Sequence, residues 1–161
     1  MDLSHINKDG SANMVDVSKK SITMRTARAE AKIVMKPETL ERVTNGGIRK
    51  GDVMTIAEIA GIAAAKKTSE LIPLCHNIPL NHVKVEFKPL NDTEMVICAE
   101  VSATAVTGVE MEALTAVSVA ALTVYDMVKS IDKDVLITDI RLLEKTGGKS
   151  GHYLRNADNP R

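Results

Sequence analysis

The sequence has very few aromatic residues, two cysteines and no excess of charge of either sign. Aromatics make up 2% of its 161 residues, and tryptophan is missing altogether. A core without large rings must be filled by aliphatic side chains, alanine and the eight methionines, and small alanine-rich helix faces let backbones approach closely. This composition, with no net charge to repel other copies, is compatible with a homo-oligomer.

The balanced charge excludes one class of partner. Lysine plus arginine and aspartate plus glutamate both number 21, so the formal net charge is zero. A neutral chain has no overall field that attracts polyanions, so we expect neither nucleic acid nor an anionic membrane as a partner. Small anionic ligands stay compatible with the sequence, because they need only a local group of cations.

The cysteines and the first residues indicate a cellular compartment. Cys75 and Cys98 are the two cysteines, and the N-terminal residues are polar, without the apolar segment of a secretory signal. No uninterrupted apolar run approaches the roughly 20 residues that span a bilayer. We therefore expect a cytoplasmic protein with two free thiols.

The pattern of apolar residues predicts one α+β domain. Alternation indicates strands over 27–35, 83–87, 95–104 and 135–143. Helices are expected from Pro37 to a turn at 45–47, over 51–67 and over 110–130, the last apolar nearly all round. This order favours an antiparallel sheet with helices on one face. The expected division is a flexible N-terminal arm at 1–20, a single catalytic domain at 21–153 and a polar C-terminal tail at 154–161.

A loop fixed by prolines carries a cysteine and a histidine. Cys75 and His76 lie between the two prolines of the run 72–80. With His82 and Cys98 they could bind zinc, but no Cys-x-x-Cys or His-x-x-x-His pair is present, and we expect no metal site. Adjacent side chains on an extended loop point apart, which argues against a Cys–His dyad. Two interpretations remain: a buried cysteine beside a hydrogen-bonded histidine, or a loop that presents His76 to a ligand.

Charged residues lie near the ends of the predicted helices. Glu110 and Glu112 open the longest helix, where carboxylates ordinarily stabilise the helix dipole. Asp126 and Lys129 share one face near its other end. They could form a surface ion pair or, if partly buried, a proton donor and acceptor. Lys50, just before a predicted helix start, could be solvated or could contact an anion.

The C-terminal glycine cluster resembles a nucleotide-binding loop only in part. The run Gly148-Lys149-Ser150 matches the end of a P-loop, but the first glycine of that motif would fall at Leu143. The segment 145–151 is then either a flexible loop or, through its glycine pair and the flanking Lys145 and Lys149, a contact for phosphate.

Taken in order, these motifs resemble the cyclic pyranopterin monophosphate synthase family over nearly the whole chain. The blocks Leu71-Ile-Pro-Leu-Cys-His76 and Gly108-Val-Glu-Met-Glu-Ala-Leu114 are highly specific together. One departure is Asn77, where the family usually has proline. The other matching runs are His5-Ile6-Asn7, Met14-Val-Asp-Val-Ser18, Lys50-Gly-Asp-Val53, Ile59-Ala-Gly-Ile62, Tyr125-Asp-Met127 and Gly147-Gly-Lys-Ser-Gly151.

The resemblance implies a fold, an assembly and a reaction. The protomer would be a ferredoxin-like α+β sandwich in a homohexamer, a trimer of dimers, with active sites at subunit interfaces. The implied enzyme is a lyase of molybdenum-cofactor biosynthesis. It would convert 3′,8-cyclo-7,8-dihydroguanosine 5′-triphosphate, supplied by an upstream radical enzyme, to cyclic pyranopterin monophosphate and pyrophosphate. No residue set suggests redox work or an organic cofactor, although magnesium could accompany the triphosphate.

The resemblance also implies roles for individual residues. Asp126 would be the catalytic acid/base and Lys129 its partner. Lys50 and Lys149 would contact the triphosphate, with Arg25 a weaker candidate. The other expected substrate-binding residues are Leu74, Cys75, His76, Glu110, Met111 and Glu112.

Two other functions stay open on the sequence. One is a metal-dependent hydrolase centred on Cys75, His76 and His82, which stoichiometric metal in the purified protein would favour. The other is a non-catalytic nucleotide-binding oligomer in which the pair of Asp126 and Lys129 is structural. Triphosphate binding without turnover would favour that second function.

Overall fold

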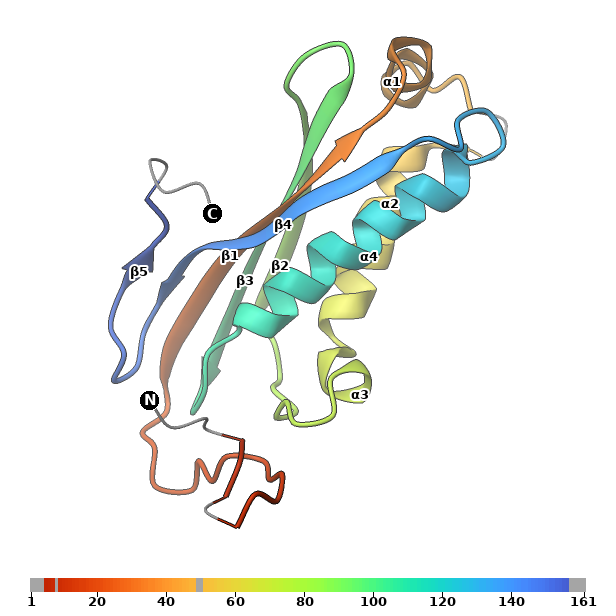
Figure 1. The fold of residues 1–161 in the computed structure, drawn as a ribbon. Helices are drawn as coiled ribbons and strands as arrows, with labels where there is room; N and C mark the ends of the chain where they lie inside the picture. Colours follow the sequence, from red (N-terminus) through yellow and green to blue (C-terminus); the bar gives the residue numbers. More distant parts are fainter. Residues whose placement is uncertain (1–4, 8, 49–50, 157–161) are drawn as a thin grey trace.

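The computed structural model describes residues 5–7, 9–48 and 51–156. Within them, five antiparallel strands form one sheet in the order β2-β3-β1-β4-β5. The strands are β1 (Thr23–Val34), β2 (His82–Pro89), β3 (Glu94–Ala105), β4 (Leu136–Thr146) and β5 (Tyr153–Leu154). The helices are α1 (Pro37–Thr44), α2 (Val53–Ala65), α3 (Thr68–Leu71) and α4 (Glu110–Val128). Helices α2 and α4 lie together on one face of the sheet (Figure 1).

The strand order defines the fold class. Strand β3 lies between β1 and β2, and β1 lies between β3 and β4, so each helical connection joins two strands that a third strand separates. This split β-α-β arrangement is that of a ferredoxin-like sandwich. The structure therefore confirms the predicted α+β fold with helices on one face of an antiparallel sheet.

Small residues let the helices approach the sheet and each other. Ala27, Ala29 and Ala31 of β1 alternate toward the helices and are at most 1% exposed. Where α2 crosses α4, a Cβ atom on Gly61 would lie 2.9 Å from the carbonyl oxygen of Ala116. The sparse aromatic content is thus compensated by close backbone packing rather than by bulky side chains.

Helix α4 is the central helix of the core. It packs against α2 and against strands β1, β3 and β4. By length and composition alone it could cross a membrane. However, Val117, Val124 and Val128 are fully buried inside the protein, as expected for the core helix of a sandwich.

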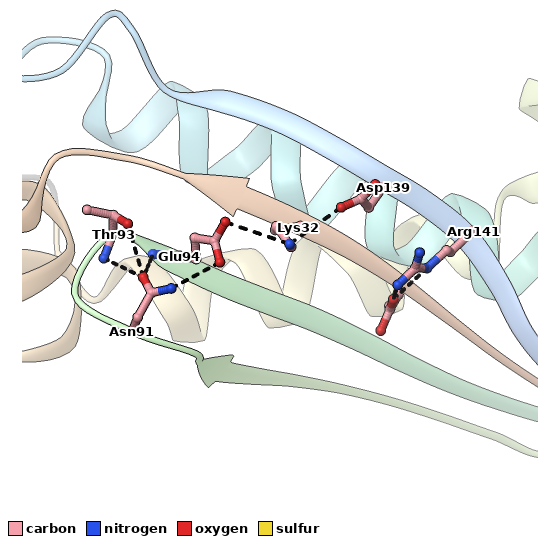
Figure 2. A network of polar contacts seen from close by, with 7 residues as sticks. Lys32, Asn91, Thr93, Glu94, Asp139 and Arg141 are labelled. Carbon is pink, nitrogen blue, oxygen red and sulfur yellow. Dashed lines mark hydrogen bonds and ion pairs between the residues drawn. The ribbon is translucent and has the colours of Figure 1, made fainter. Parts of the chain in front are cut away.

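The open face of the sheet carries a network of charged side chains (Figure 2). Lys32 Nζ lies 3.7 Å from Glu94 Oε1 and 3.6 Å from Asp139 Oδ2. Nearby, Arg141 Nε donates to Glu30 Oε1 at 2.7 Å. Asp139 has a positive φ of 52°, and the β1–β4 register shifts between Glu30 and Lys32. The ion pairs thus span an irregularity in the strand pairing.

The C-terminal region differs from the sequence prediction. Strand β4 continues to Thr146 and pairs through Glu144 with Leu154 of the short β5. The flexible-loop interpretation is therefore wrong for Lys145 and Thr146, which belong to β4. Gly147 and Gly148, with φ of 94° and 73°, supply left-handed backbone for the connection. The division at 153/154 stays a prediction, although strand pairing crosses it.

Candidate functional site

A cavity of about 280 Å³ lies between the N-terminal arm, the proline loop and the first turn of α4. Here we call it the Glu112 cavity. It brings together all six substrate-binding residues predicted in the loop and the helix, namely Leu74, Cys75, His76, Glu110, Met111 and Glu112. Its wall is completed by His5, Val15, Val17, Lys20, Ile78, Thr107 and Gly108.

Glu112 is the most perturbed ionisable group of this cavity. Its side chain is buried, since the residue is only 4% exposed. Burial, with a smaller contribution from the Glu110 carboxylate, raises its pKa from 4.5 to about 7. No described cationic side chain forms an ion pair with it. At neutral pH this carboxyl can therefore both hold and release a proton, as a general acid/base must.

The surroundings of Cys75 disfavour the ionised, reactive form of its side chain. Burial first, and the nearby Glu112 second, raise the pKa of its thiol. The nucleophilic form of cysteine is the thiolate, which these surroundings disfavour. Cys75 is thus suited to shape the cavity rather than to attack a ligand.

His76 is held by the backbone of the arm. Its Nε2 lies 2.8 Å from the carbonyl oxygen of Val15. A carbonyl oxygen can only accept, so Nε2 carries the hydrogen of this bond. Of the two interpretations left open by the sequence, the first holds for the hydrogen-bonded His76 but not for Cys75, which is only half-buried. His76 also lines the cavity, and its contact with a ligand stays a prediction.

Cations gather beside the Glu112 cavity. A second cavity of about 160 Å³ shares Lys20, Thr107, Gly108 and Glu110 with the first. A third, of about 500 Å³, shares Lys20, Arg25 and Lys149 with the second. We call this continuous region, with its cations Lys19, Lys20, Arg25, Lys145 and Lys149, the basic trough.

The glycine pair allows Arg25 to form the floor of the trough. Arg25 is 8% exposed and donates from Nε and Nη2 to the carbonyl oxygens of Ala105 and Val106, each at 3.2 Å. A Cβ atom on Gly148 would overlap the Arg25 guanidinium. Only a glycine lets the β4–β5 connection, with Lys149, lie this close to the arginine.

Glu110 lies at the boundary between the two regions. Its Oε1 is 2.9 Å from Lys145 Nζ, and it lines both the Glu112 cavity and the trough. The two glutamates of the helix start therefore differ. Glu110 is neutralised by a lysine, whereas Glu112 is buried without one among the described residues.

The predicted catalytic pair lies at the other end of α4. Lys129 Nζ is 2.7 Å from Asp126 Oδ1, and the two side chains are 52% and 60% exposed. Asp126 is fourteen positions beyond Glu112 on α4, which corresponds to about 21 Å along the helix axis. Figure 1 shows the two ends of α4 at opposite ends of the sandwich. One chain alone does not bring Asp126 and Lys129 to the cavity.

Other predicted residues have different outcomes. Lys50 lies outside the described residues. Lys149 and Arg25 lie together in the trough, and their role as anion contacts stays a prediction. In the part of the chain that the structure describes, no group of three or more His, Cys, Asp or Glu residues could hold a metal ion. This leaves the hydrolase hypothesis without a ligand set there.

Two contributors to the site were not among the residues predicted from the sequence. Lys20 lines all three cavities, and Val15 supplies the carbonyl that holds His76. Both belong to the polar segment 1–20, which lacks apolar periodicity. The matching run Met14-Val-Asp-Val-Ser18 contains Val15 but gives no signal for Lys20.

The fold and the site define an α+β protein with a cavity beside a region lined by cations. The MoaC family model matches residues 14–148. A cyclic pyranopterin monophosphate synthase of Desulfitobacterium hafniense is 55% identical over 155 residues, 96% of this chain and 95% of that protein. One from Magnetococcus marinus is 54% identical over 96% of both chains. Cyclic pyranopterin monophosphate synthase 3 of Mycobacterium tuberculosis is 54% identical over 96% of this chain and 87% of its own. The chain belongs to the MoaC family, as its motifs predicted.

Proposed function

We propose that this chain is a cyclic pyranopterin monophosphate synthase, a lyase of molybdenum-cofactor biosynthesis. It converts 3′,8-cyclo-7,8-dihydroguanosine 5′-triphosphate to cyclic pyranopterin monophosphate and pyrophosphate. The observation that carries the proposal is the adjacency of the Glu112 cavity and the basic trough, in a chain 55% identical to a protein of that name.

The two regions match the two parts of this substrate. The ring system fits the Glu112 cavity, where Leu74 and Met111 offer apolar contact and His76 and Glu112 offer hydrogen-bonding groups. The triphosphate fits the trough, where Arg25 and Lys149 supply positive charge. Charge-assisted bonds of this kind are the strong ones in phosphate recognition.

The chemistry requires proton transfer at one end and charge stabilisation at the other. Converting a purine-derived ring to a pterin moves protons at several ring positions, which suits a carboxyl with a pKa of about 7 such as Glu112. To close the cyclic phosphate, a sugar hydroxyl attacks the α-phosphorus and gives its proton to a base. The bond from that phosphorus to the bridging oxygen breaks, and pyrophosphate leaves with its charge stabilised by the lysines.

An oligomer completes the site. Asp126 is the acid/base and Lys129 its partner, and a second copy must supply them because they lie about 21 Å along α4 from Glu112. We propose a homohexamer, a trimer of dimers, with sites between subunits. Exposed apolar side chains on the helices support an interface: Ile56, Ile59, Leu71 and Leu122.

The remaining assignments follow from the same reaction. We place the enzyme in the cytoplasm, where an upstream radical enzyme supplies the cyclised triphosphate. No resident cofactor is needed, and any magnesium arrives with the triphosphate. Lys50 is proposed as a further phosphate contact on the family resemblance alone.

One observation favours a second candidate, a non-catalytic nucleotide-binding oligomer. Asp126 and Lys129 form an exposed ion pair remote from the cavity of their own chain, as a purely structural pair would. A single assay separates the two functions. The purified protein is given the cyclised triphosphate, and pterin fluorescence after oxidation is measured together with pyrophosphate. Both products are expected in equal amounts, whereas binding without turnover would support the second candidate.

A further inference from the structure

One wall of the Glu112 cavity is formed by residues 11–20, which we call the strap. Asn13, Val15 and Val17 are half-buried, and the residues between them are exposed. Such alternation is that of an extended segment with one side on the protein. Val15, Val17 and Lys20 line the cavity, so a ligand enters past the strap or after it has moved.

The strap has little to hold it in place. Among the described residues, its one hydrogen bond to the body of the protein is that from His76 to the Val15 carbonyl. Its other bonds are local, for example from Asn13 N–H to His5 O and from Lys20 N–H to Val17 O, each 3.0 Å. A segment with so few attachments opens at low free-energy cost compared with the sheet and helices.

We propose that the Val15 carbonyl is a positioning group, which holds the strap over the Glu112 cavity and fixes the tautomer of His76 with a proton on Nε2. The bond requires an N–H at Nε2, because a carbonyl has no hydrogen to donate. In the neutral ring the other nitrogen, Nδ1, then carries a lone pair and accepts. Nδ1 has no hydrogen-bond partner among the described residues, so it is available to a ligand.

The tautomer determines which ligands fit. A closed strap offers an acceptor at His76 Nδ1, which favours a nitrogen heterocycle that presents a ring N–H or amino group. The opposite tautomer would offer a donor and favour ring nitrogens with lone pairs. The choice of a heterocycle rests on the proposed function, but the strap and its bond to His76 do not.

Closure of the strap is also linked to the basic trough. The strap ends at Lys20, which lines both the cavity and the trough. An open strap would displace this cation, so an anion in the trough and the closed strap should stabilise each other.

Two variants of His76 test the hydrogen bond in the full chain without ligand. In His76→Gln the side-chain amide nitrogen can reach the Nε2 position and still donate to Val15. In His76→Asn the side chain is too short, although a polar group stays near Nδ1. His152→Gln, which removes an exposed ring paired with Glu144, is the matched control.

The readout is the rate of trypsin cleavage after the exposed Lys19 and Lys20, which follows the open fraction of the strap. Loss of one hydrogen bond should speed cleavage about five- to tenfold in His76→Asn. His76→Gln and the control should stay within about twofold of wild type. Equal cleavage rates for the two His76 variants would overturn the proposal.

Nitrogen NMR of the wild-type histidines provides an independent test that needs no variant. In spectra recorded at a pH where the imidazole is neutral, the proton of His76 should be on Nε2. A neutral ring with its proton on Nδ1 would overturn the proposal even if the enzyme assay succeeds, and the Nε2 tautomer would support the proposal even if that assay fails.

Discussion

Replacing Glu112 by glutamine should remove a pH-dependent loss of stability. In the folded protein the pKa of this carboxyl is raised from 4.5 to about 7, so the folded chain holds a proton that the unfolded chain releases. Between these values the folded state binds more protons, and its free energy of unfolding therefore falls as the pH rises. Below pH 4.5 both states are protonated and the effect vanishes. Glutamine cannot ionise, so the variant lacks this decline.

The magnitude follows from the shift of the pKa. A rise from 4.5 to about 7 is about 2.5 units, or about 3 kcal/mol at 1.36 kcal/mol per unit. Because the carboxyl borders an open cavity, solvent screening should reduce this to about 2 kcal/mol. From pH 4.5 to about pH 8, the free energy of unfolding of Glu112→Gln should therefore gain about 2 kcal/mol relative to wild type.

Urea unfolding at several pH values and a fixed protein concentration measures this difference. Glu58→Gln, which removes an exposed carboxylate on α2, controls for the general loss of charge and should change by only tenths of a kcal/mol. A difference between wild type and Glu112→Gln that stays constant from pH 4.5 to about pH 8 would refute the assignment of Glu112 as a proton-exchanging group.

Three further predictions concern packing, a buried carboxylate and the trough. Gly61→Ala places a Cβ atom 2.9 Å from a carbonyl oxygen of α4, and thermal unfolding should reveal a net destabilisation of about 1 kcal/mol after the gain in helix propensity; unchanged stability would contradict the close packing. Buried Asp132 accepts from the backbone N–H groups of Lys36 and Asp134, which lowers its pKa. Asp132→Asn should cost about 1.5–3 kcal/mol near neutral pH, and denaturant titrations should show this cost shrinking as the pH falls below about 4, because the wild-type stabilisation is lost as the carboxylate is protonated. Lys149→Gln should lower kcat/KM about tenfold, since it removes a cation that binds the triphosphate and stabilises the departing pyrophosphate; an unchanged kcat/KM in steady-state assays would remove Lys149 from the phosphate site.

Much of the fold could be predicted because its signals are local. The alternation of Ala27, Ala29, Ala31 and Ile33 continues through most of β1, and every one of these residues is buried. The two-residue β5 gives no such signal. Its pairing with β4 depends on glycines with left-handed backbone. From the sequence alone, these glycines are equally compatible with a loose loop.

The candidate site could be predicted only in part, for a similar reason. Cys75, His76 and Glu112 come from two compact sequence blocks that meet in one cavity. The contrast between Glu110 and Glu112 could not be foreseen, because it depends on which carboxylate lies near Lys145 and which is buried. By contrast, the separation of Asp126 from Glu112 follows from the helix predicted over 110–130, which corresponds to α4 in the structure.

The central claim is that this chain performs the synthase reaction at a site shared by two copies. Subunit mixing tests it most directly, with Asp126→Asn and Glu112→Gln each prepared alone and then exchanged in equal amounts. Each variant alone should form almost no pterin from the cyclised triphosphate. In mixed oligomers about one quarter of the sites combine an intact cavity from one variant with an intact Asp126 from the other, so about a quarter of wild-type turnover should return. Mixed oligomers that stay inactive, or an Asp126→Asn variant with full activity by itself, would contradict the claim.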